Sequence, residues 1–227
     1  MSVVQCTHRA LEEGDLRIGI VSDIHGNAAG LATALERMGD VDELLCVGDI
    51  VEEYRFNNEA VALLREREAR CVLGNHDLGL LSAQGVRARS AGHVDPALVA
   101  WLASHPLTID TVVEGKRLVM THASPCAPHT QYVMAGSPEL ARIGEVDADF
   151  VVIGHTHAQL VQRVGRPLVI NPGSAGQARD HSNGKQLSYA VLDTGSEHVE
   201  IDNYRLAAIS PAAAISPDPT SAGAPHR

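Results

Sequence analysis

The amino-acid sequence predicts a layered α/β domain in which a helix-covered sheet packs on a second, strand-rich sheet. In the first half of the chain, short apolar strands alternate with amphipathic helices, which is the pattern of β-α-β units. The second half is a succession of short apolar strands separated by turn residues. With 227 residues the chain can bury a sizeable core without disulfides, so a single domain is the first expectation.

The first half contains three predicted strands and two predicted helices. The strands cover Arg17–Ser22, Leu44–Val47 and Arg70–Leu73. The first helix covers Ala28–Met38, and its apolar face consists of Leu31, Ala32, Leu35 and Met38. Either Asn57 or Asn58 can cap the second helix, which contains Val61 and Leu64.

Further elements follow from caps, turns and apolar runs. A capping residue precedes proline at Asp95-Pro96 and at Ser137-Pro138, which predicts helices near Ala97–Ala103 and Glu139–Ile143. The remaining apolar runs predict strands at Leu107–Val113, Arg117–Thr121, Phe150–Ile153, Leu160–Val164, Leu168–Ile170, Leu187–Asp193 and His198–Arg205. Glu114-Gly115 and Gly165-Arg166 are predicted hairpin turns.

The two ends of the chain differ from its centre in composition. Residues 1–15 are polar without a steady period and are predicted to form an N-terminal arm, while 16–206 form the domain. Residues 207–227 are rich in Ala, Pro and Ser and poor in large apolar side chains, so we expect a disordered tail.

Charge and cysteine usage limit the function classes. The formal net charge is -10 and no Lys/Arg cluster occurs, which argues against a nucleic-acid surface. No stretch approaches the roughly 18 apolar residues of a membrane helix. The four cysteines form no CxxC pair, and the first residues lack the apolar stretch of a signal peptide, so we expect a reducing cytoplasm. Cys46 and Cys71 lie in predicted strands and are expected to be small buried side chains.

Side chains able to bind a metal follow five of the predicted strands. These clusters are Ser22–Asn27, Gly48-Asp49, Gly74–Asp77, Thr121-His122 and Gly154–His157. Any one of them has an ordinary explanation, because Asp and Asn cap helices and glycine forms turns. However, five of the twelve histidines lie in these clusters. Ligands of open α/β sheets bind outside the carboxyl ends of strands, so we expect the clusters to converge.

The spacing and type of these side chains indicate a metal centre. Residues i and i+2 of extended backbone face the same way, so Asp23 and His25 are predicted to bind one ion together, and His155 and His157 have the same spacing. Carboxylate, imidazole and amide ligands without thiolate favour Mn, Fe or Zn. Because there are more candidates than one ion needs, we expect two. Such a pair generates hydroxide and binds phosphoryl oxygens, which allows an acidic protein to bind a small phosphorylated substrate.

The ordered motifs of this sequence resemble the calcineurin-like metallophosphoesterases, specifically their compact bacterial branch. The resemblance covers Ile18 to about Asp193 and depends on Ser-Asp-Ile-His-Gly-Asn, Gly-Asp-Ile-Val, Gly-Asn-His-Asp, Thr-His and Gly-His-Thr-His. The loop Asn171-Pro172-Gly173-Ser174 is also similar to one in this branch. The resemblance implies a four-layer α/β/β/α sandwich, with two mixed sheets flanked by helices. It also implies a dinuclear metal-dependent phosphoesterase that hydrolyses a small phosphomonoester or phosphodiester by in-line attack of a metal-bridging hydroxide.

The same resemblance implies a role for individual residues. Carried over motif by motif, it assigns one metal to Asp23, His25 and His157, the other to Asn75, His122 and His155, and the bridging position to Asp49. His76 is then the group that stabilises the transition state and protonates the leaving oxygen, with Asp77 fixing the tautomer of its ring. Manganese is the first expectation for both ions, with Fe or Zn as alternatives.

The sequence departs from the family pattern after the second motif. Relatives in this branch often continue Gly-Asp-Ile-Val with Gly-Tyr-Gly-Pro, whereas this chain has Glu52 to Asn57 there. The protein phosphatases of the superfamily continue the motif with Asp-Arg-Gly, so a phosphoprotein substrate is disfavoured. Tyr54 or Phe56 could stack on a ring, and Arg55 could meet a second phosphate; the alternative is a solvated loop with a helix cap.

Other candidate substrate residues lie later in the chain. Arg179 is either a phosphate clamp or the partner of Asp180 in a surface ion pair. His129 and Tyr132 follow the His122 motif and could reach the mouth of the site.

Two alternative functions remain open from the sequence. One is a nucleotide or dinucleoside polyphosphate hydrolase, suggested by Tyr54, Arg55 and Phe56. The other, from a different class, is a non-catalytic protein-binding scaffold on the same fold. The motifs of serine hydrolases, P-loop proteins and Rossmann dinucleotide-binding proteins do not occur. The sequence leaves the oligomeric state open.

Overall fold

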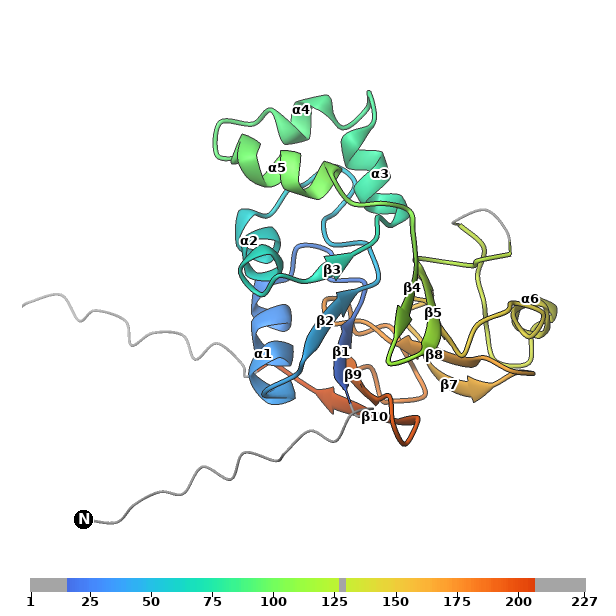
Figure 1. The fold of residues 1–227 in the computed structure, drawn as a ribbon. Helices are drawn as coiled ribbons and strands as arrows, with labels where there is room; N and C mark the ends of the chain where they lie inside the picture. Colours follow the sequence, from blue (N-terminus) through green and yellow to red (C-terminus); the bar gives the residue numbers. More distant parts are fainter. Residues whose placement is uncertain (1–15, 127–129, 207–227) are drawn as a thin grey trace, which may run out of the picture.

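Two five-stranded mixed sheets form the centre of the structure (Figure 1). The computed structural model describes residues 16–126 and 130–206. The predicted arm at 1–15, the predicted tail at 207–227 and His129 lie outside the described residues.

The first sheet combines the start of the described chain with its end. Its strand order is β10-β9-β1-β2-β3. The strands are β1 (Arg17–Val21), β2 (Glu43–Cys46), β3 (Arg70–Cys71), β9 (Leu187–Asp193) and β10 (His198–Tyr204). β1, β2 and β3 run parallel because helices connect them, while β9 is antiparallel to both β1 and β10.

The second sheet comes from the middle of the chain and has the order β4-β5-β6-β8-β7. Its strands are β4 (Thr108–Val113), β5 (Lys116–Thr121), β6 (Phe150–Val152), β7 (Gln159–Arg163) and β8 (Leu168–Pro172). β5, β6 and β8 are parallel, and β4 and β7 are antiparallel edge strands. The predicted turn at Glu114-Gly115 joins β4 to β5 with φ of 47° and 75°, the left-handed values of a tight hairpin.

The predicted helices form, three of them with a cap that the sequence predicted, whereas the cap of the first helix, Asn27, was not predicted. Asn27 caps α1 (Ala28–Met38), Asn57 caps α2 (Asn58–Glu66), Asp95 caps α5 (Pro96–Ala103) and Ser137 caps α6 (Pro138–Ile143). In each case the side-chain oxygen accepts a backbone N–H of the first turn. Within the described ranges the helices are all too short or too polar to span a lipid bilayer.

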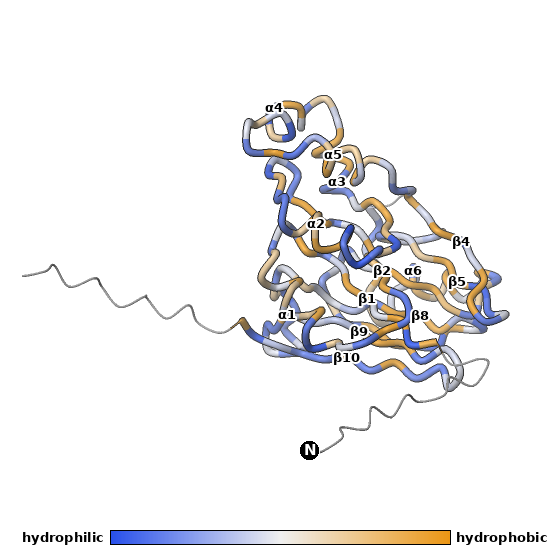
Figure 2. The backbone as a smooth tube through the Cα atoms, turned by 60° about the vertical axis from the view of Figure 1, so that its left-hand side comes forward, coloured by the Kyte–Doolittle hydropathy of each residue, from blue (hydrophilic) through white to orange (hydrophobic). Residues whose placement is uncertain are grey.

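Alternate residues along the strands fill three apolar layers. Ile18 and Ile20 of β1 pack between the sheets with Met120 and Phe150 of the second sheet. The opposite face of the first sheet packs under α1 and α2, and the opposite face of the second sheet packs against α6. The order is therefore helix, sheet, sheet, helix, which confirms the four-layer α/β/β/α sandwich. The hydropathy colouring follows it, with apolar strands inside and polar loops outside (Figure 2).

Several predicted details of the first half are wrong. The buried face of α1 contains Ala34, whereas Ala32 is exposed, because one position along a helix turns the side chain by about 100°. Phe56 is 4% exposed and packs in the core under the first sheet, so it cannot stack on a substrate ring. β3 ends at Cys71, two residues before the predicted end.

Two helices were not predicted, namely α3 (Asn75–Leu81) and α4 (Val86–Arg89). The first turn of α3 is the Asn-His-Asp part of a predicted metal motif, so its polar residues hide the helical period. Together with α5, these helices form the extension at the top of Figure 1. The cysteine prediction is correct, since Cys46 and Cys71 are both fully buried.

The carboxyl ends of the parallel strands meet at one edge, where backbone hydrogen bonds join the following loops. The N–H of Asp23 donates to the carbonyl of Gly48 at 3.0 Å, and that of His25 donates to the carbonyl of Asp49 at 2.9 Å. On the second sheet, the N–H of Gly154 donates to the carbonyl of His122 at 2.8 Å. The predicted convergence of the motifs is thus built into the backbone.

Candidate metal centre

Five of the seven predicted metal ligands have a left-handed backbone. The φ angle is 53° at Asp23, 48° at His25, 52° at Asp49, 68° at His155 and 57° at His157. This region costs a non-glycine residue roughly 1–2 kcal/mol, and such strain concentrates at functional sites. The side chains converge because the chain reverses sharply after each strand. Asp23 and His25 do belong to one ligand group, as predicted. However, the i, i+2 alternation of extended backbone does not bring them together, because both have left-handed φ angles.

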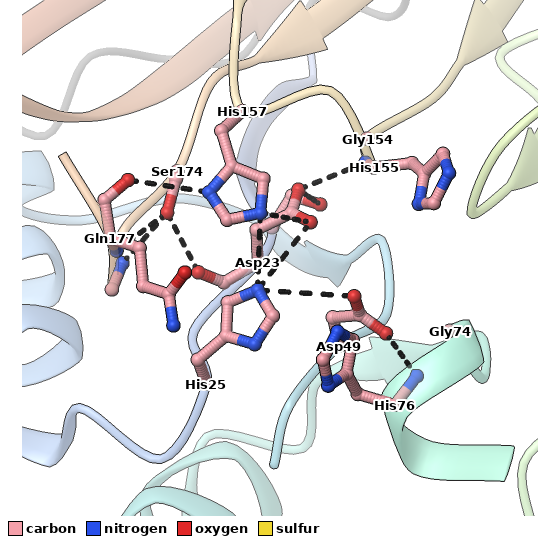
Figure 3. A network of polar contacts seen from close by, with 12 residues as sticks. Asp23, His25, Asp49, Gly74, His76, Gly154, His155, His157, Ser174 and Gln177 are labelled. Atoms are coloured by element: carbon pink, nitrogen blue, oxygen red, sulfur yellow. Dashed lines mark hydrogen bonds and ion pairs between the residues drawn. The ribbon is translucent and has the colours of Figure 1, made fainter. Parts of the chain in front are cut away.

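The first ligand group consists of Asp23, His25 and His157, all of them buried. His157 Nε2 lies 3.4 Å from Asp23 Oδ1 and 3.1 Å from His25 Nε2. Figure 3 shows these three side chains pointing toward one another, Asp23 and His25 from the loop after β1 and His157 from the loop after β6. They form the set that the resemblance implies for one metal.

The second ligand group consists of Asp49, His122 and His155, also buried. His122 Nε2 lies 3.3 Å from Asp49 Oδ2, and His122 Nδ1 lies 2.7 Å from the carbonyl oxygen of Val47. Because a carbonyl only accepts, Nδ1 carries a proton, and in the neutral ring that binds a metal Nε2 has the lone pair. His155 and His157 therefore belong to different ligand groups. The family resemblance implies this separation, whereas their i, i+2 spacing alone suggests that they bind the same ion.

Asp49 lies between the two groups. Its Oδ2 is 3.9 Å from His25 Nε2 in one group and 3.3 Å from His122 Nε2 in the other. Its Oδ1 accepts the backbone N–H of His76 at 2.8 Å, which fixes the direction of the carboxylate. This is the position that a bridging ligand requires.

The outer atoms of the ligands are held by the loops around them. Asp23 Oδ2 accepts the hydroxyl of Ser22 at 2.7 Å and the N–H of His155 at 3.0 Å, which leaves Oδ1 facing the centre. The hydroxyl of Ser174 donates to the carbonyl of Asp23 at 2.7 Å. His157 Nδ1 lies 3.3 Å from the carbonyl oxygen of Gln177.

Two glycines of the motifs are required by close packing beside the ligands. A Cβ on Gly74 would lie 2.1 Å from Asp49 Oδ1, and a Cβ on Gly154 would lie 2.1 Å from Ser22 Oγ and 2.9 Å from Asp23 Oδ2. Any side chain at these positions would displace a carboxylate. This is the physical reason for glycine before Asn75 and before His155.

The pKa shifts at the centre follow from burial and from one close pair. Burial raises the pKa of Asp23 to about 7 and lowers the pKa of His25 to about 3 and that of His157 to about 4. Burial acts in the same way on Asp49 and His122, but their mutual attraction outweighs it. The pKa of Asp49 falls to about 2 and that of His122 rises to about 9. The protein alone thus disfavours charge on Asp23, which a bound cation would reverse.

The donor atoms fit divalent metal ions. Asp23 Oδ1, Asn75 Oδ1 and His122 Nε2 are buried without a hydrogen-bond partner in the described structure. An unpaired buried polar atom is costly unless a ligand supplies its partner. All three belong to the predicted ligand set, and the set contains only nitrogen and oxygen donors, as expected for Mn, Fe or Zn.

The structure gives Asp77 different partners from those predicted. Asp77 Oδ1 accepts the N–H of Val51 at 3.0 Å, and Oδ2 accepts the N–H of Gly74 at 2.9 Å. It therefore caps α3 and fixes the loop after β2, and no ion pair or hydrogen bond to the His76 ring occurs among the described residues. The carboxylate that faces His76 is Glu52, whose Oε2 lies 3.6 Å from His76 Nδ1. Glu52 was not predicted because it lies outside the strand-end motifs.

The predicted substrate residues lie around the centre at different depths. Tyr54 is 61% exposed and its hydroxyl donates to Glu53 at 2.8 Å, while Arg55 is also exposed. Both line a surface pocket that reaches His76. Arg179 is exposed, close enough to His25 and His157 to lower the pKa of both.

Two further predictions concern neighbours of these residues. Asp180 is held by the N–H of Gln159 and by Ser182, and no ion pair to Arg179 is found in the described part of the chain. The ring of Tyr132 is 62% exposed and lies over His155, with ring centroids 4.3 Å apart. Tyr132 therefore does reach the ligand groups.

Comparison with known proteins identifies the family of this chain. A family model described as the calcineurin-like phosphoesterase superfamily domain matches residues 16–197. The chain belongs to the calcineurin-like phosphoesterase superfamily. A metallophosphoesterase structure from Sphaerobacter thermophilus is similar with a TM-score of 0.67 and 26% identity, over 84% of this chain and 88% of that one. This calcineurin-like phosphoesterase is accordingly a metal-dependent hydrolase of phosphoric esters, from a family that generally binds two divalent metal ions.

Two curated relatives differ in how much of the chain they match. An uncharacterized protein of Methanocaldococcus jannaschii is 28% identical over 81% of this phosphoesterase and 85% of its own length. The symmetrical bis(5'-nucleosyl)-tetraphosphatase of Shewanella frigidimarina is 35% identical, over 45% of this chain and 43% of its own. The chain thus spans less than half the length of that tetraphosphatase.

Proposed function

We propose that this phosphoesterase hydrolyses a small phosphomonoester or phosphodiester at a dinuclear centre. The observation that carries the proposal is the position of Asp49 Oδ2, which faces His25 of one ligand group and His122 of the other. We further propose manganese as the ion at both positions. The predicted cytoplasmic location stays a prediction.

Each ligand has a proposed place at the centre. Asp23, His25 and His157 would hold one ion, Asn75, His122 and His155 the other, and Asp49 both. The bound pair would supply a nucleophilic hydroxide at neutral pH and positive charge for the phosphoryl oxygens. Ser22, Ser174 and the carbonyl of Val47 keep the ligands in orientation through their outer atoms.

His76 is the proposed general acid. Its ring lies at the first turn of α3, 4.8 Å from the His25 ring between centroids, and its side chain is 29% exposed. This places it at the boundary between the buried ligands and the surface pocket. From there, Nε2 can give a proton to the leaving oxygen of a substrate bound at the centre.

Substrate selection is proposed to depend on exposed side chains around this boundary. Arg179 is a candidate clamp for a non-bridging phosphoryl oxygen, because it approaches the first ligand group from solvent. Tyr54 and Arg55 line the pocket beside His76 and can contact the part of the substrate that leaves. Replacing Arg179 by Ala is expected to raise KM more than it lowers kcat.

A nucleotide or dinucleoside polyphosphate is the second candidate substrate class. It is supported by the partial match to the bis(5'-nucleosyl)-tetraphosphatases and by the exposed ring of Tyr54, which is available for stacking on a base. The burial of Phe56 removes one of the three side chains that suggested it.

Hydrolysis assays with a substrate panel test both classes. Nitrophenyl phosphate, bis-nitrophenyl phosphate, mononucleotides and diadenosine tetraphosphate are compared with added Mn²⁺, with and without chelator. We expect metal-dependent turnover that is lost in Asp49→Asn and in His76→Ala. Robust turnover in Asp49→Asn would contradict the bridging role. Metal content below one ion per chain, together with no turnover, would instead favour the non-catalytic scaffold.

A further inference from the structure

Glu52 is an acidic side chain outside the predicted ligand set that lies beside the rings of both an assigned ligand and the proposed general acid. Its Oε1 lies 3.6 Å from His25 Nδ1, and its Oε2 lies 3.6 Å from His76 Nδ1. Both ring nitrogens are buried and have no hydrogen-bond partner in the described structure. The carboxylate of Glu52 therefore faces two unsatisfied nitrogens, one with each oxygen.

The position of Glu52 is fixed by its own contacts. The side chain of Gln177 donates to Glu52 Oε1 at 2.7 Å. On the backbone, the N–H of Glu52 donates to the carbonyl of Arg55 at 3.3 Å, and the N–H of Arg55 donates back at 3.1 Å. Because Arg55 holds its backbone and Gln177 holds its carboxylate, and because its side chain is only 27% exposed, Glu52 differs from a freely solvated carboxylate. Shortening each 3.6 Å gap to the usual 2.9 Å or so requires only a small side-chain movement.

The geometry points to Glu52 as a positioning residue that holds the outer nitrogen of His25 and of His76 at the same time. On His25, an N–H on Nδ1 directed at Glu52 leaves the lone pair of Nε2 for a cation, as in carboxylate–histidine–metal arrangements. On His76, an N–H on Nδ1 directed at the same carboxylate fixes the ring so that Nε2, with the proton that it donates, faces the leaving oxygen. Glu52 thus performs the orienting role that the sequence assigned to Asp77, and it links that role to a metal ligand. The inference rests on the proposed function for its kinetic consequence.

A third metal ion held by His25, Glu52 and His76 is the competing interpretation, since their ligand atoms lie within 4.8 Å of one another. A neutral imidazole has one lone pair. If His25 Nε2 binds the first cation, its Nδ1 is an N–H donor and cannot bind another. We therefore assign the contact to hydrogen bonding.

Glu52→Gln is the informative variant, because it keeps the shape and one oxygen that can accept from Gln177 but loses the second acceptor. Glu36→Gln, which removes one charge from the exposed face of α1, is the matched control.

Two esters are compared: nitrophenyl phosphate, whose leaving group departs readily without a proton, and phenyl phosphate, whose more basic leaving group needs one. We expect Glu52→Gln to lower kcat for phenyl phosphate by roughly 10–100-fold, and for nitrophenyl phosphate by clearly less. Glu36→Gln should change neither, and equal losses on both esters would overturn the link to His76.

Long-range ¹H–¹⁵N NMR of the full-length, Zn²⁺-loaded protein tests the same inference without turnover. In the wild type we expect Nδ1 of His25 and Nδ1 of His76 each to carry a proton directed at Glu52. In Glu52→Gln the His76 ring should shift toward the Nε2–H form, while metal content stays at two ions per chain. Unchanged His76 signals in the variant would overturn the inference. A metal content of three Zn²⁺ per chain in the wild type and two in the variant would also overturn it, because Glu52 would then be a metal ligand. If the wild type hydrolyses neither ester, the proposed function fails, and the NMR result still decides the role of Glu52.

Discussion

The carboxylate of Asp23 accepts the backbone N–H of His155 at 3.0 Å, which joins the loop after β1 of the first sheet to the loop after β6 of the second. A single buried acid thus connects the two sheets and supplies a metal ligand. The first use needs only an acceptor oxygen, whereas the second needs the negative charge. Substitution can separate them.

Asp23→Asn is expected to stabilise the metal-free protein and to weaken metal binding. Burial raises the pKa of Asp23 to about 7, so the charged form is unfavourable without a cation. Asparagine can retain the oxygen that accepts from Ser22 and His155 and removes the charge. Each pKa unit corresponds to about 1.4 kcal/mol, so we expect a gain on the order of 1 kcal/mol or more. In a thermal melt with chelator, this is a rise of roughly 2–4 °C in Tm.

With metal added the order should reverse, because the wild type gains stability from the bound ions and the variant gains less. Asp202→Asn, which removes a partly exposed carboxylate paired with Arg37, is the control and should not raise Tm in chelator. An Asp23→Asn protein that melts below the wild type in chelator would contradict the argument.

The shared position of Asp49 predicts a specific pattern of metal loss. Asp49→Asn should weaken both ions, whereas His157→Gln should weaken only the ion of the first group, since His157 has no place in the second. Metal analysis after dialysis is expected to give two ions per chain in the wild type, about one in His157→Gln and close to none in Asp49→Asn. His198→Gln, on the exposed face of the edge strand β10, serves as the control. One ion retained in Asp49→Asn would show that the groups are independent.

Close packing beside the ligands predicts a cost for Gly154→Ala. The added Cβ would meet Ser22 Oγ at 2.1 Å and Asp23 Oδ2 at 2.9 Å, so the loop must move. Overpacking of this kind typically costs about 1–3 kcal/mol, and the movement also displaces His155. Urea unfolding should show this loss together with weaker metal binding. Gly92→Ala meets no atom within 4 Å and should leave both unchanged, and equal behaviour of the two variants would contradict the prediction.

The sequence was sufficient to predict the architecture because the strands and caps are local signals. Ile18 and Ile20 alternate with residues that face α1, and Asn57 and Asp95 begin helices through their own side chains. Ligand identities came from ordered motifs. What the motifs do not encode is the backbone that presents them, such as the left-handed φ at Asp23.

The corrections concern side chains whose partners are distant in sequence. Asp77 follows His76 directly, so a contact between them was a natural expectation, but a helix begins there and turns Asp77 toward the N–H groups of Val51 and Gly74. Glu52 meets His76 across 24 positions, and Gln177 meets Glu52 across 125. No local period reports such pairs, and only the folded rim brings them together.

His105 predicts how stability depends on pH away from the metal centre. Burial lowers the pKa of His105 below its usual 6.5, and its ring lies edge-on to Trp101 with centroids 4.3 Å apart. Below pH 6.5 the unfolded chain therefore binds a proton at this position more readily than the folded one. The stability that comes from neutral His105 is full above about pH 6.5 and is lost as the pH falls toward the folded pKa.

His105→Phe keeps a ring against Trp101 and cannot titrate. In urea unfolding of chelated protein from pH 7 to 5, we expect a shallower decline than in the wild type. His93→Gln, which removes an exposed histidine, should decline like the wild type. If the unfolding free energies of His105→Phe and the wild type fall with the same slope against pH, then His105 binds a proton equally well in the folded and the unfolded chain, which would contradict the prediction.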